Sequence, residues 1–399
     1  MPYYRRVGEV PRKRHMQFHR PDGGLYAEEL MGEEGFSADA ALLYHRHPPT
    51  AITKAEVVPA AEAGGLGVGT GDLAPNRPLL PRHLDTHALE AGRDLVEGRQ
   101  VLLANAQVRL SYAWAEAPSG CYRDAVGDEC VYLEAGRARL ESVYGALEVA
   151  AGDYVVVPRA TTHRWVPHEA VRALVVEAAG HIRPPRRYLS DTGQFLEAAP
   201  YGERDLRAPQ EVLLVEEGET PVLVRHRDGL TRYTYAHHPF DVVGWDGCLY
   251  PFSFAMADFE PIVKAFHAPP PVHQTFEGPG FVVCSFCPRP FDFDPRSIPV
   301  PYNHANVDSD EVLFYVGGDF MSRKGAGISL GSITLHPGGF VHGPQPGSVE
   351  AALGQARTEE WAVMVDTFSP LFLGPGAARC EDPEYAWSWA RGDQAGAGR

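Results

Sequence analysis

Hydrophobic positions in this chain come in short runs that polar turns interrupt after a few residues. The runs are rich in β-branched and aromatic residues, and Gly, Pro or Asp bounds them; examples are VYLEAG, DYVVVPR, VRALVVEAAG, EVLLVEEG, GFVVCSFC, EVLFYVGG and WAVMVDTF. Short strands at regular spacing are typical of a β-sandwich or barrel, and long patterns of helical period are scarce. The pattern therefore predicts an all-β fold.

Two segments repeat the same arrangement of positions. GDECVYLEAG (127–136) and SDEVLFYVGG (309–318) each contain Asp-Glu, an apolar run, and a Gly seven residues after the Glu. A Gly-led strand that ends in Pro and His follows each of them, as GDYVVVPRATTH (152–163) and GSITLHPGGFVH (331–342). An internal repeat of this kind indicates a duplicated β-sandwich.

The repeat divides the chain into three parts. We expect residues 1–90 to form an irregular N-terminal arm that includes a Gly/Pro-rich loop. Residues 91–255 would hold the first sandwich and a connecting segment, and residues 256–399 the second sandwich and a C-terminal tail. A chain of 399 residues is long enough for two packed domains.

Composition narrows the function classes. The net charge of −16 argues against a nucleic-acid partner, because such proteins usually carry basic patches. Neither an apolar run of membrane-spanning length nor a secretory signal is visible. Six cysteines at no framework spacing favour a reduced, cytoplasmic compartment. Cys284 and Cys287 form one C-x-x-C pair, which we interpret as buried strand thiols.

The second copy contains residues of metal-binding type. It has His304, then Glu311, and His342 after a Pro-Gly-Gly turn, which resembles the two signature motifs of the cupin superfamily with Asn306 at the second His position. Two imidazoles and one carboxylate leave coordination positions open, as Fe(II) oxygenases require. We therefore predict one mononuclear Fe(II) site. Asp310 is a rival to Glu311; we prefer Glu311 because its spacing to the following Gly repeats in the first copy.

The first copy lacks part of this set. Glu129 and His163 are present, but Tyr122 and Asp124 stand where the two His positions of the motif fall. One imidazole and one carboxylate are a poor metal site. We expect this copy to be metal-free, with Glu129 and His163 in ordinary hydrogen bonds.

Several segments together resemble one family. PYNHANVDSDEVLFYVGG, HPGGFVHGPQPG, AFHAPPPVHQTF, LYAEELMGEEGFS and LLYHRHPPTAI are similar to segments of homogentisate 1,2-dioxygenases. The resemblance implies a bicupin with one Fe(II). It also implies extradiol-type cleavage of the homogentisate ring by dioxygen, which gives maleylacetoacetate, a step in tyrosine and phenylalanine catabolism.

Carried over by position, the resemblance assigns roles to individual residues. The iron ligands fall on His304, Glu311 and His342. The acid/base histidine falls on His267, and histidine is the usual side chain for proton exchange near neutral pH. A histidine behind the ligands falls on His336, and we group His336 and His342 with the substrate-binding residues.

The resemblance also assigns residues to the substrate pocket. A pocket tyrosine falls on Tyr302, and Phe320 and Phe340 are further candidates for the ring walls. The tyrosine that helps to hold the substrate carboxylate in the family falls on Phe320, which cannot form a hydrogen bond. Arg323 or Lys324 could hold the carboxylate in its place.

Two other functions fit the same residues. One is a cupin dioxygenase that acts on gentisate-like or aminophenol-like rings, and the other is a non-enzymatic bicupin that binds a small ligand. For the enzyme, the partners are a small aromatic substrate and dioxygen. We also expect a homo-oligomer.

Overall fold

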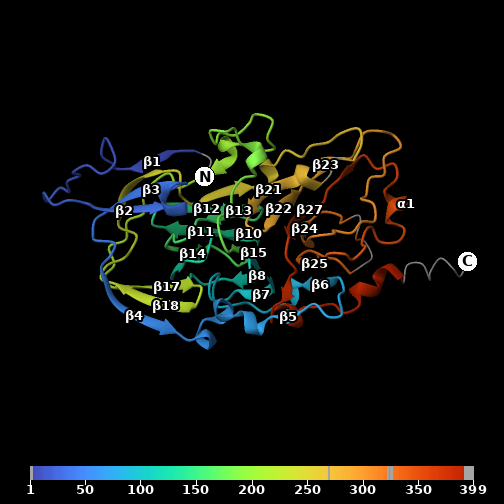
Figure 1. Ribbon diagram of the computed structural model, residues 1–399, viewed down its shortest axis with the longest axis horizontal. Helices are drawn as coiled ribbons and strands as arrows, with labels where there is room; N and C mark the ends of the chain where they lie inside the picture. Colours follow the sequence, from blue (N-terminus) through green and yellow to red (C-terminus); the bar gives the residue numbers. More distant parts are fainter. Residues whose placement is uncertain (1–2, 268–269, 321–322, 324–326, 391–399) are drawn as a thin grey trace, which may run out of the picture. The chain divides into compact units, whose positions relative to one another are not determined.

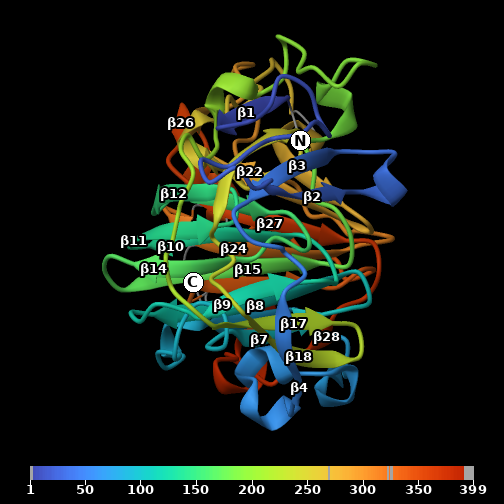
Figure 2. The same cartoon turned by 90° about the vertical axis from the view of Figure 1, so that its left-hand side faces the viewer.

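β-Strands and the loops between them make up nearly all of the described part of the chain (Figures 1 and 2). The computed structural model describes residues 3–267, 270–320, 323 and 327–390. Within these residues there is a single α-helix, α1 (Ser348–Ala352). The described helices are all far shorter than a bilayer requires, so none of them is a candidate membrane span. The prediction of an all-β fold is confirmed.

The chain divides into two compact units. Unit 1 comprises residues 1–69, 91–100 and 111–255, and unit 2 comprises residues 70–90, 101–110 and 256–399. The segment 1–90, expected to be an arm, is thus divided between the units and contributes strands to both. Its strands pair with partners far along the sequence, as when Leu43 lies opposite Trp245. A local pattern does not reveal such pairing.

Unit 1 contains three groups of strands. One sheet has the order β1 (Arg5–Gly8), β19 (Val242–Gly247), β3 (Ala40–His45), β2 (Ala27–Gly32). A second has the order β12 (Gly145–Ala150), β11 (Arg137–Ser142), β14 (His163–Pro167), β9 (Cys121–Asp124), β17 (Thr220–His226), β18 (Gly229–Tyr235), β4 (Ile52–Val58). The third group runs β16 (Leu206–Arg207), β20 (Phe252–Ala255), β13 (Asp153–Val157), β10 (Glu129–Ala135), β15 (Val171–Ala178), β8 (Val108–Ala115).

Unit 2 is organised around one six-stranded sheet. Its order is β21 (Gln274–Gly278), β22 (Phe281–Phe286), β27 (Trp361–Thr367), β24 (Asp310–Gly317), β25 (Ser332–His336), β6 (Arg82–Asp85). Short pairs flank it: β23 (Arg289–Pro290) with β26 (Arg357–Thr358), and β28 (Phe372–Leu373) with β5 (Ala74–Pro75) and β7 (Gln100–Ala104).

Short 3-10 helices connect the strands. In unit 1 they are η1 (Glu34–Phe36), η2 (Ala60–Glu62), η3 (Gly64–Gly67), η6 (Arg186–Tyr188) and η7 (Glu203–Asp205). In unit 2 they are η4 (Thr70–Asp72), η5 (Thr86–Ala88), η8 (Met256–Asp258), η9 (Pro270–His273), η11 (Ala377–Arg379) and η12 (Tyr385–Trp387).

Strand alternation decides which side chains reach the interior of unit 2. Successive residues of a strand point to opposite faces of the sheet. On β24, Val312 and Phe314 are buried on one face, and Glu311, Leu313 and Tyr315 lie on the other. The second face therefore carries Glu311, the acidic side chain that the sequence predicts as a metal ligand.

The two copies repeat the same strand register, as the sequence repeat predicts. In unit 1, Glu129 of β10 lies opposite Glu177 of β15. In unit 2, Glu311 of β24 lies opposite Asp366 of β27. Each copy therefore places two acidic residues side by side on neighbouring strands.

A second pair of positions is also duplicated. Tyr122 bridges to His163 in unit 1, and His304 bridges to His342 in unit 2. In unit 2, both N–H groups donate across the bridge, to the opposite carbonyls, at 2.8 Å. Residues that share such a bridge have their side chains on the same side of the backbone. The His304 and His342 rings lie with their centroids 4.3 Å apart.

Candidate metal centre

His304, Glu311 and His342 meet at one point in unit 2. Nε2 of His304 is 3.7 Å from Oε2 of Glu311, and Nε2 of His342 is 3.3 Å from Oε1. One ligand atom from each of the three side chains lies within 4.8 Å of the others. Bonds of about 2 Å from one cation would span such separations. The three residues could therefore hold a single metal ion.

Hydrogen bonds orient both imidazoles toward this point. Nδ1 of His304 donates to the carbonyl of Tyr302 at 3.0 Å, and Nδ1 of His342 donates to that of Phe340 at 3.1 Å. A carbonyl only accepts, so each Nδ1 carries the hydrogen and each Nε2 keeps its lone pair. Nε2 of His342 is buried and has no hydrogen-bond partner among the described residues. An unpartnered buried lone pair facing a carboxylate fits a bound cation.

Glu311 is held in its charged form. Burial alone would raise the pKa of Glu311, but the neighbouring imidazoles of His304, His336 and His342 outweigh it and hold this pKa well below its usual range. Nδ1 of His336 lies 2.8 Å from Oε1 of Glu311, and its Nε2 lies 2.9 Å from the hydroxyl of Tyr385. Glu311 is thus an ionised carboxylate that the hydrogen bond from His336 holds in position.

The position of His336 differs from the expected substrate-binding role. Its side chain is fully buried, both ring nitrogens have partners, and its ring stacks on His342 with centroids 4.2 Å apart. Burial lowers the pKa of His336 to about 3, with the Arg323 charge as the next cause, so the imidazole is neutral. His336 orients the carboxylate of Glu311 and does not line a cavity.

Asp310 points away from the three residues. Its Oδ1 accepts from the backbone N–H of Gly338 at 2.8 Å, and its Oδ2 accepts from that of Leu371 at 2.7 Å. Asp128 in unit 1 uses its two oxygens in the same way. Both carboxylate oxygens of Asp310 are therefore committed to the backbone, which leaves Glu311 as the acid that faces His304 and His342.

A cavity of about 160 Å³ lies over the centre. Apolar side chains form part of its wall, and these include Ile262, Val263, Phe286, Phe291, Leu313 and Met364. Polar lining residues include His267, His273, Arg289, Asp292, His304, Glu311, Arg323 and Glu360. One small ring fits this space, because cavities for drug-sized ligands are typically about 300–1,000 Å³.

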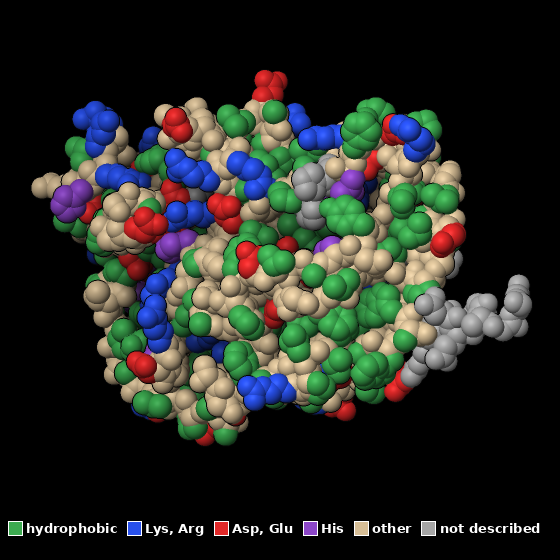
Figure 3. All heavy atoms as spheres, turned by 45° about the vertical axis from the view of Figure 1, so that its right-hand side comes forward, with side chains coloured by type: hydrophobic (Ala, Val, Ile, Leu, Met, Phe, Trp, Pro, Cys, Tyr) green, Lys and Arg blue, Asp and Glu red, His purple; other side chains and the backbone are tan. Residues whose placement is uncertain are grey.

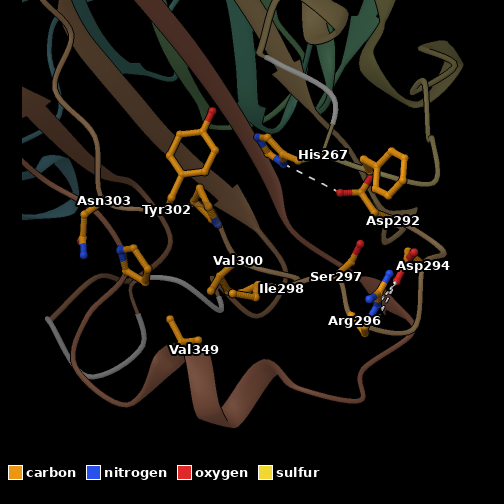
Figure 4. A pocket seen from close by; sticks show the side chains of 13 residues that line it. His267, Asp292, Asp294, Arg296, Ser297, Ile298, Val300, Tyr302, Asn303 and Val349 are labelled. Atoms are coloured by element: carbon orange, nitrogen blue, oxygen red, sulfur yellow. Dashed lines mark hydrogen bonds and ion pairs between the residues drawn. The ribbon is translucent and has the colours of Figure 1, made fainter.

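An outer cleft of about 620 Å³ adjoins the cavity (Figure 4). His267, Asp292 and Pro301 line both hollows, so they mark the passage between them. Exposed apolar side chains such as Phe266 and Ile298 line the cleft. Hydrophobic side chains also gather on the face shown in Figure 3.

His267 lies beside this passage. Its Nδ1 is 3.9 Å from Oδ2 of Asp292, and Figure 4 shows the two side chains pointing toward each other. The His267 ring is 5.3 Å from the Tyr302 ring, which in turn is 6.1 Å from the His304 ring. The structure thus brings His267, Tyr302 and His304, three of the residues named from sequence, into one row.

The other expected pocket residues are placed differently. Phe320 has a left-handed backbone (φ 43°), which turns its ring onto Tyr315 with centroids 5.3 Å apart. Phe320 and Phe340 line neither hollow, and Phe340 contributes its carbonyl to His342 instead of its ring. Arg323 lines the cavity, and Lys324 lies outside the described residues.

Sequence reasoning missed several residues of the site. Arg289, Glu360 and His273 line the cavity. Asp366 has one buried oxygen without a hydrogen-bond partner among the described residues. Burial, followed by repulsion from Glu311, raises the pKa of Asp366 to about 8. A signal for Asp366 existed in the acidic residue that follows an apolar run in both VRALVVEA and WAVMVDT.

A guanidinium takes the place of a metal in unit 1. Arg99 donates to both carboxylate oxygens of Glu129 and, at 3.3 Å, to Glu177. Arg225 donates to Asp124 at 2.6 Å and to Glu177 at 3.0 Å. Although the three carboxylates of Asp124, Glu129 and Glu177 could hold an ion, each of them already binds a guanidinium group. The expected hydrogen bonds of Glu129 are present here.

His163 keeps the orientation of its counterpart His342. Its Nδ1 lies 3.1 Å from the carbonyl of Thr161, and its buried Nε2 has no hydrogen-bond partner among the described residues. Nε2 lies 3.6 Å from Glu129, which is bound to Arg99. Unit 1 thus preserves the imidazole but fills the cation position with protein.

We expect variants in unit 1 to change stability without changing metal content. His163→Ala should leave the metal content per chain as in the wild type. Arg99→Met leaves buried carboxylates without their cation and should lower the free energy of unfolding by about 3–5 kcal/mol. Metal analysis and denaturant unfolding measure both effects. Loss of half the bound metal in His163→Ala would reveal a second metal site.

The comparisons with known proteins agree with this organisation. The family model described as homogentisate 1,2-dioxygenase N-terminal matches residues 84–256. The protein named "Putative dioxygenase SSO1533" of Saccharolobus solfataricus is 38% identical over 393 residues, which cover 98% of this chain and 99% of that protein. Homogentisate 1,2-dioxygenase of Emericella nidulans is 24% identical over 357 residues, 82% of this chain and 77% of that protein.

Among solved structures, a cupin-2 domain containing protein from Shewanella frigidimarina matches with a TM-score of 0.20 and 16% identity, over 20% of this chain and 79% of that one. The similarity to the Saccharolobus solfataricus protein, in contrast, spans nearly both whole chains. Together with the family model, this similarity assigns the chain. The chain belongs to the homogentisate dioxygenase family.

Proposed function

We propose that this protein is a non-haem Fe(II) dioxygenase that cleaves the ring of homogentisate or of a close dihydroxy-aromatic acid. With homogentisate the product would be maleylacetoacetate. The observation that supports it most is the trio of His304, Glu311 and His342, with one unpartnered buried Nε2 on His342. His304 and Glu311 line a cavity the size of one ring. Family membership supports the same reaction.

The donor set of two imidazoles and one carboxylate is of the type that suits Fe(II). When bound, iron would supply open coordination positions for an oxygen of the substrate and for dioxygen. The residues of the protein prepare this site. Tyr302 and Phe340 fix the histidine tautomers through their carbonyls, and His336 holds the Glu311 carboxylate in place.

His267 is the residue placed to move a proton. It lies at the passage from the outer cleft into the cavity, where the hydroxyl of an entering diphenol would come within its reach. Asp292, 3.9 Å from Nδ1, would stabilise the imidazolium that forms. The proton accepted from the phenol can then return to the product.

The apolar wall serves orientation and exclusion of water. Phe286, Leu313 and Met364 line the cavity on the side of the sheet that carries Glu311. A flat ring placed against them displaces water from the site, which strengthens the electrostatic interactions inside it. The small volume favours single-ring substrates over larger ones.

Oxygen consumption by iron-loaded protein tests the proposal. With homogentisate we expect one dioxygen consumed per substrate, and a product whose mass exceeds that of the substrate by two oxygen atoms. His304→Ala should abolish the consumption. An oxygen electrode and mass spectrometry of the product give both readouts.

Other substrates decide between the remaining possibilities. Rapid consumption with gentisate or an aminophenol, and none with homogentisate, would keep ring cleavage but replace the substrate. Absence of consumption with every diphenol, despite full iron loading, would contradict an enzymatic role and favour a ligand-binding bicupin.

A further inference from the structure

Arg289 is a guanidinium that faces the cavity with most of its donors unused. It lies on β23, where it is paired with Thr358 of β26, and it lines the cavity over the centre. Its contacts are a hydrogen bond to the carbonyl of Cys287 at 3.1 Å and a position over the Phe286 ring, 5.5 Å from the centroid. Arginine has five N–H donors in a planar fork. No described residue forms an ion pair with Arg289.

The surroundings favour an external anion as its partner. Burial lowers the pKa of Arg289, yet arginine remains charged in proteins at neutral pH. Of the carboxylates that influence it, Glu360 is half-buried, and desolvation raises the pKa of Glu360 and so disfavours its charge. Asp292 also influences Arg289 but lies beside His267. Arg289 is half-buried, and a partly desolvated cation without a paired anion is costly unless a ligand completes it.

Arg323 is less suited to receive a ligand, although it lines the same cavity. Its NH1 donates to the carbonyl of Gly343, and its guanidinium lies over the Trp389 ring, 5.8 Å from the centroid. The whole residue is buried, with 5% of its surface exposed. Arg323 therefore holds the backbone beside His342, whereas the guanidinium of Arg289 is free to meet a substrate.

We propose that Arg289 binds the carboxylate of an aromatic acid whose ring lies over His304 and Glu311. This inference rests on the proposed function and names the group that selects its substrate. A carboxylate matches the planar fork of arginine with two parallel hydrogen bonds, and Phe286 holds the fork in position. The position that family resemblance suggested, Phe320, packs on Tyr315 and lines neither hollow.

The test compares two rings that differ in the acid group. Homogentisate carries a carboxylate, and methylhydroquinone has the same para-diphenol ring without it. Arg289→Met should raise the KM for homogentisate by at least about tenfold, the loss expected for a charged hydrogen bond. The KM for methylhydroquinone should stay within about twofold of the wild-type value. The KM of Arg289→Lys for homogentisate should lie between the values for the wild type and Arg289→Met, because the lysine ammonium is a point charge without the planar fork of donors.

Anaerobic calorimetry of the same two compounds gives a readout without turnover. Arg357→Met is the matched control: this arginine lies opposite Pro290 on β26, is exposed, and pairs with Glu359. It should change neither binding constant. Iron content and melting temperature verify that each variant is folded. If Arg289→Met unfolds or loses iron, Arg289→Lys becomes the test. It should bind homogentisate more weakly than the wild type and bind methylhydroquinone equally well.

The outcomes separate this inference from the proposed function. If the wild type binds homogentisate through Arg289 but consumes no oxygen with it, the proposed carboxylate site is supported and the proposed dioxygenase activity is refuted. If Arg289→Met weakens the binding of both compounds equally, or of neither, the role of Arg289 is refuted whatever the oxygen consumption. Failure of the wild type to bind either compound would refute it as well.

Discussion

Glu311→Gln is expected to remove nearly all iron from the protein, whereas Asp310→Asn is expected to retain it. The two acids are neighbours on β24, and strand alternation points them to opposite faces. Glutamine keeps the size of Glu311 but removes the charge that faces His304 and His342. Two neutral imidazoles alone would hold the cation poorly.

Asp310→Asn should show a different defect. The carboxylate of Asp310 accepts hydrogen bonds from two backbone N–H groups, one on each oxygen. The asparagine side chain has only one oxygen, so one of these N–H groups loses its acceptor. We expect a cost of about 1–3 kcal/mol in the free energy of unfolding with iron content near that of the wild type. Metal analysis of anaerobically prepared protein and denaturant unfolding measure both quantities. Iron loss in Asp310→Asn with retention in Glu311→Gln would show that the wrong acid was chosen.

His267→Ala should lower kcat by about 10²–10⁴-fold and leave iron in place. This is the usual contribution of a general acid or base. His267 lies at the passage into the cavity and is not one of the three side chains whose ligand atoms meet, so its loss leaves those three in place. His304→Ala, in contrast, should lose iron and activity together.

Single-turnover oxygen consumption, with iron content measured on the same samples, tests this prediction. His226→Ala is a suitable control, because His226 belongs to β17 of unit 1 and contacts Thr231. It should leave kcat unchanged. Iron loss in His267→Ala would place His267 among the ligands, and unchanged kcat would remove it from the proton transfer.

The linear amino-acid pattern was sufficient to predict the strands, the duplication and the residue types of the candidate metal centre. Alternating apolar runs between turns specify β-structure because side chains of a strand point alternately to its two faces. In both copies a Gly lies seven residues after the Glu and a strand ending in His follows, with 34 residues from Glu129 to His163 and 31 from Glu311 to His342. The same register appears in both units. These features are local, so a linear pattern carries them.

Only the tertiary structure decided which distant residues join that centre. Arg289, Asp366 and Glu360 come from segments whose patterns resemble turns or ordinary strands. In unit 1, Arg99 reaches Glu129 across thirty residues and takes the cation position. Pairing between strands far apart in sequence brings these charges together, and a linear pattern does not encode which strand lies beside which. The identity of a charged partner inside a sheet therefore emerges only once the sheet is formed.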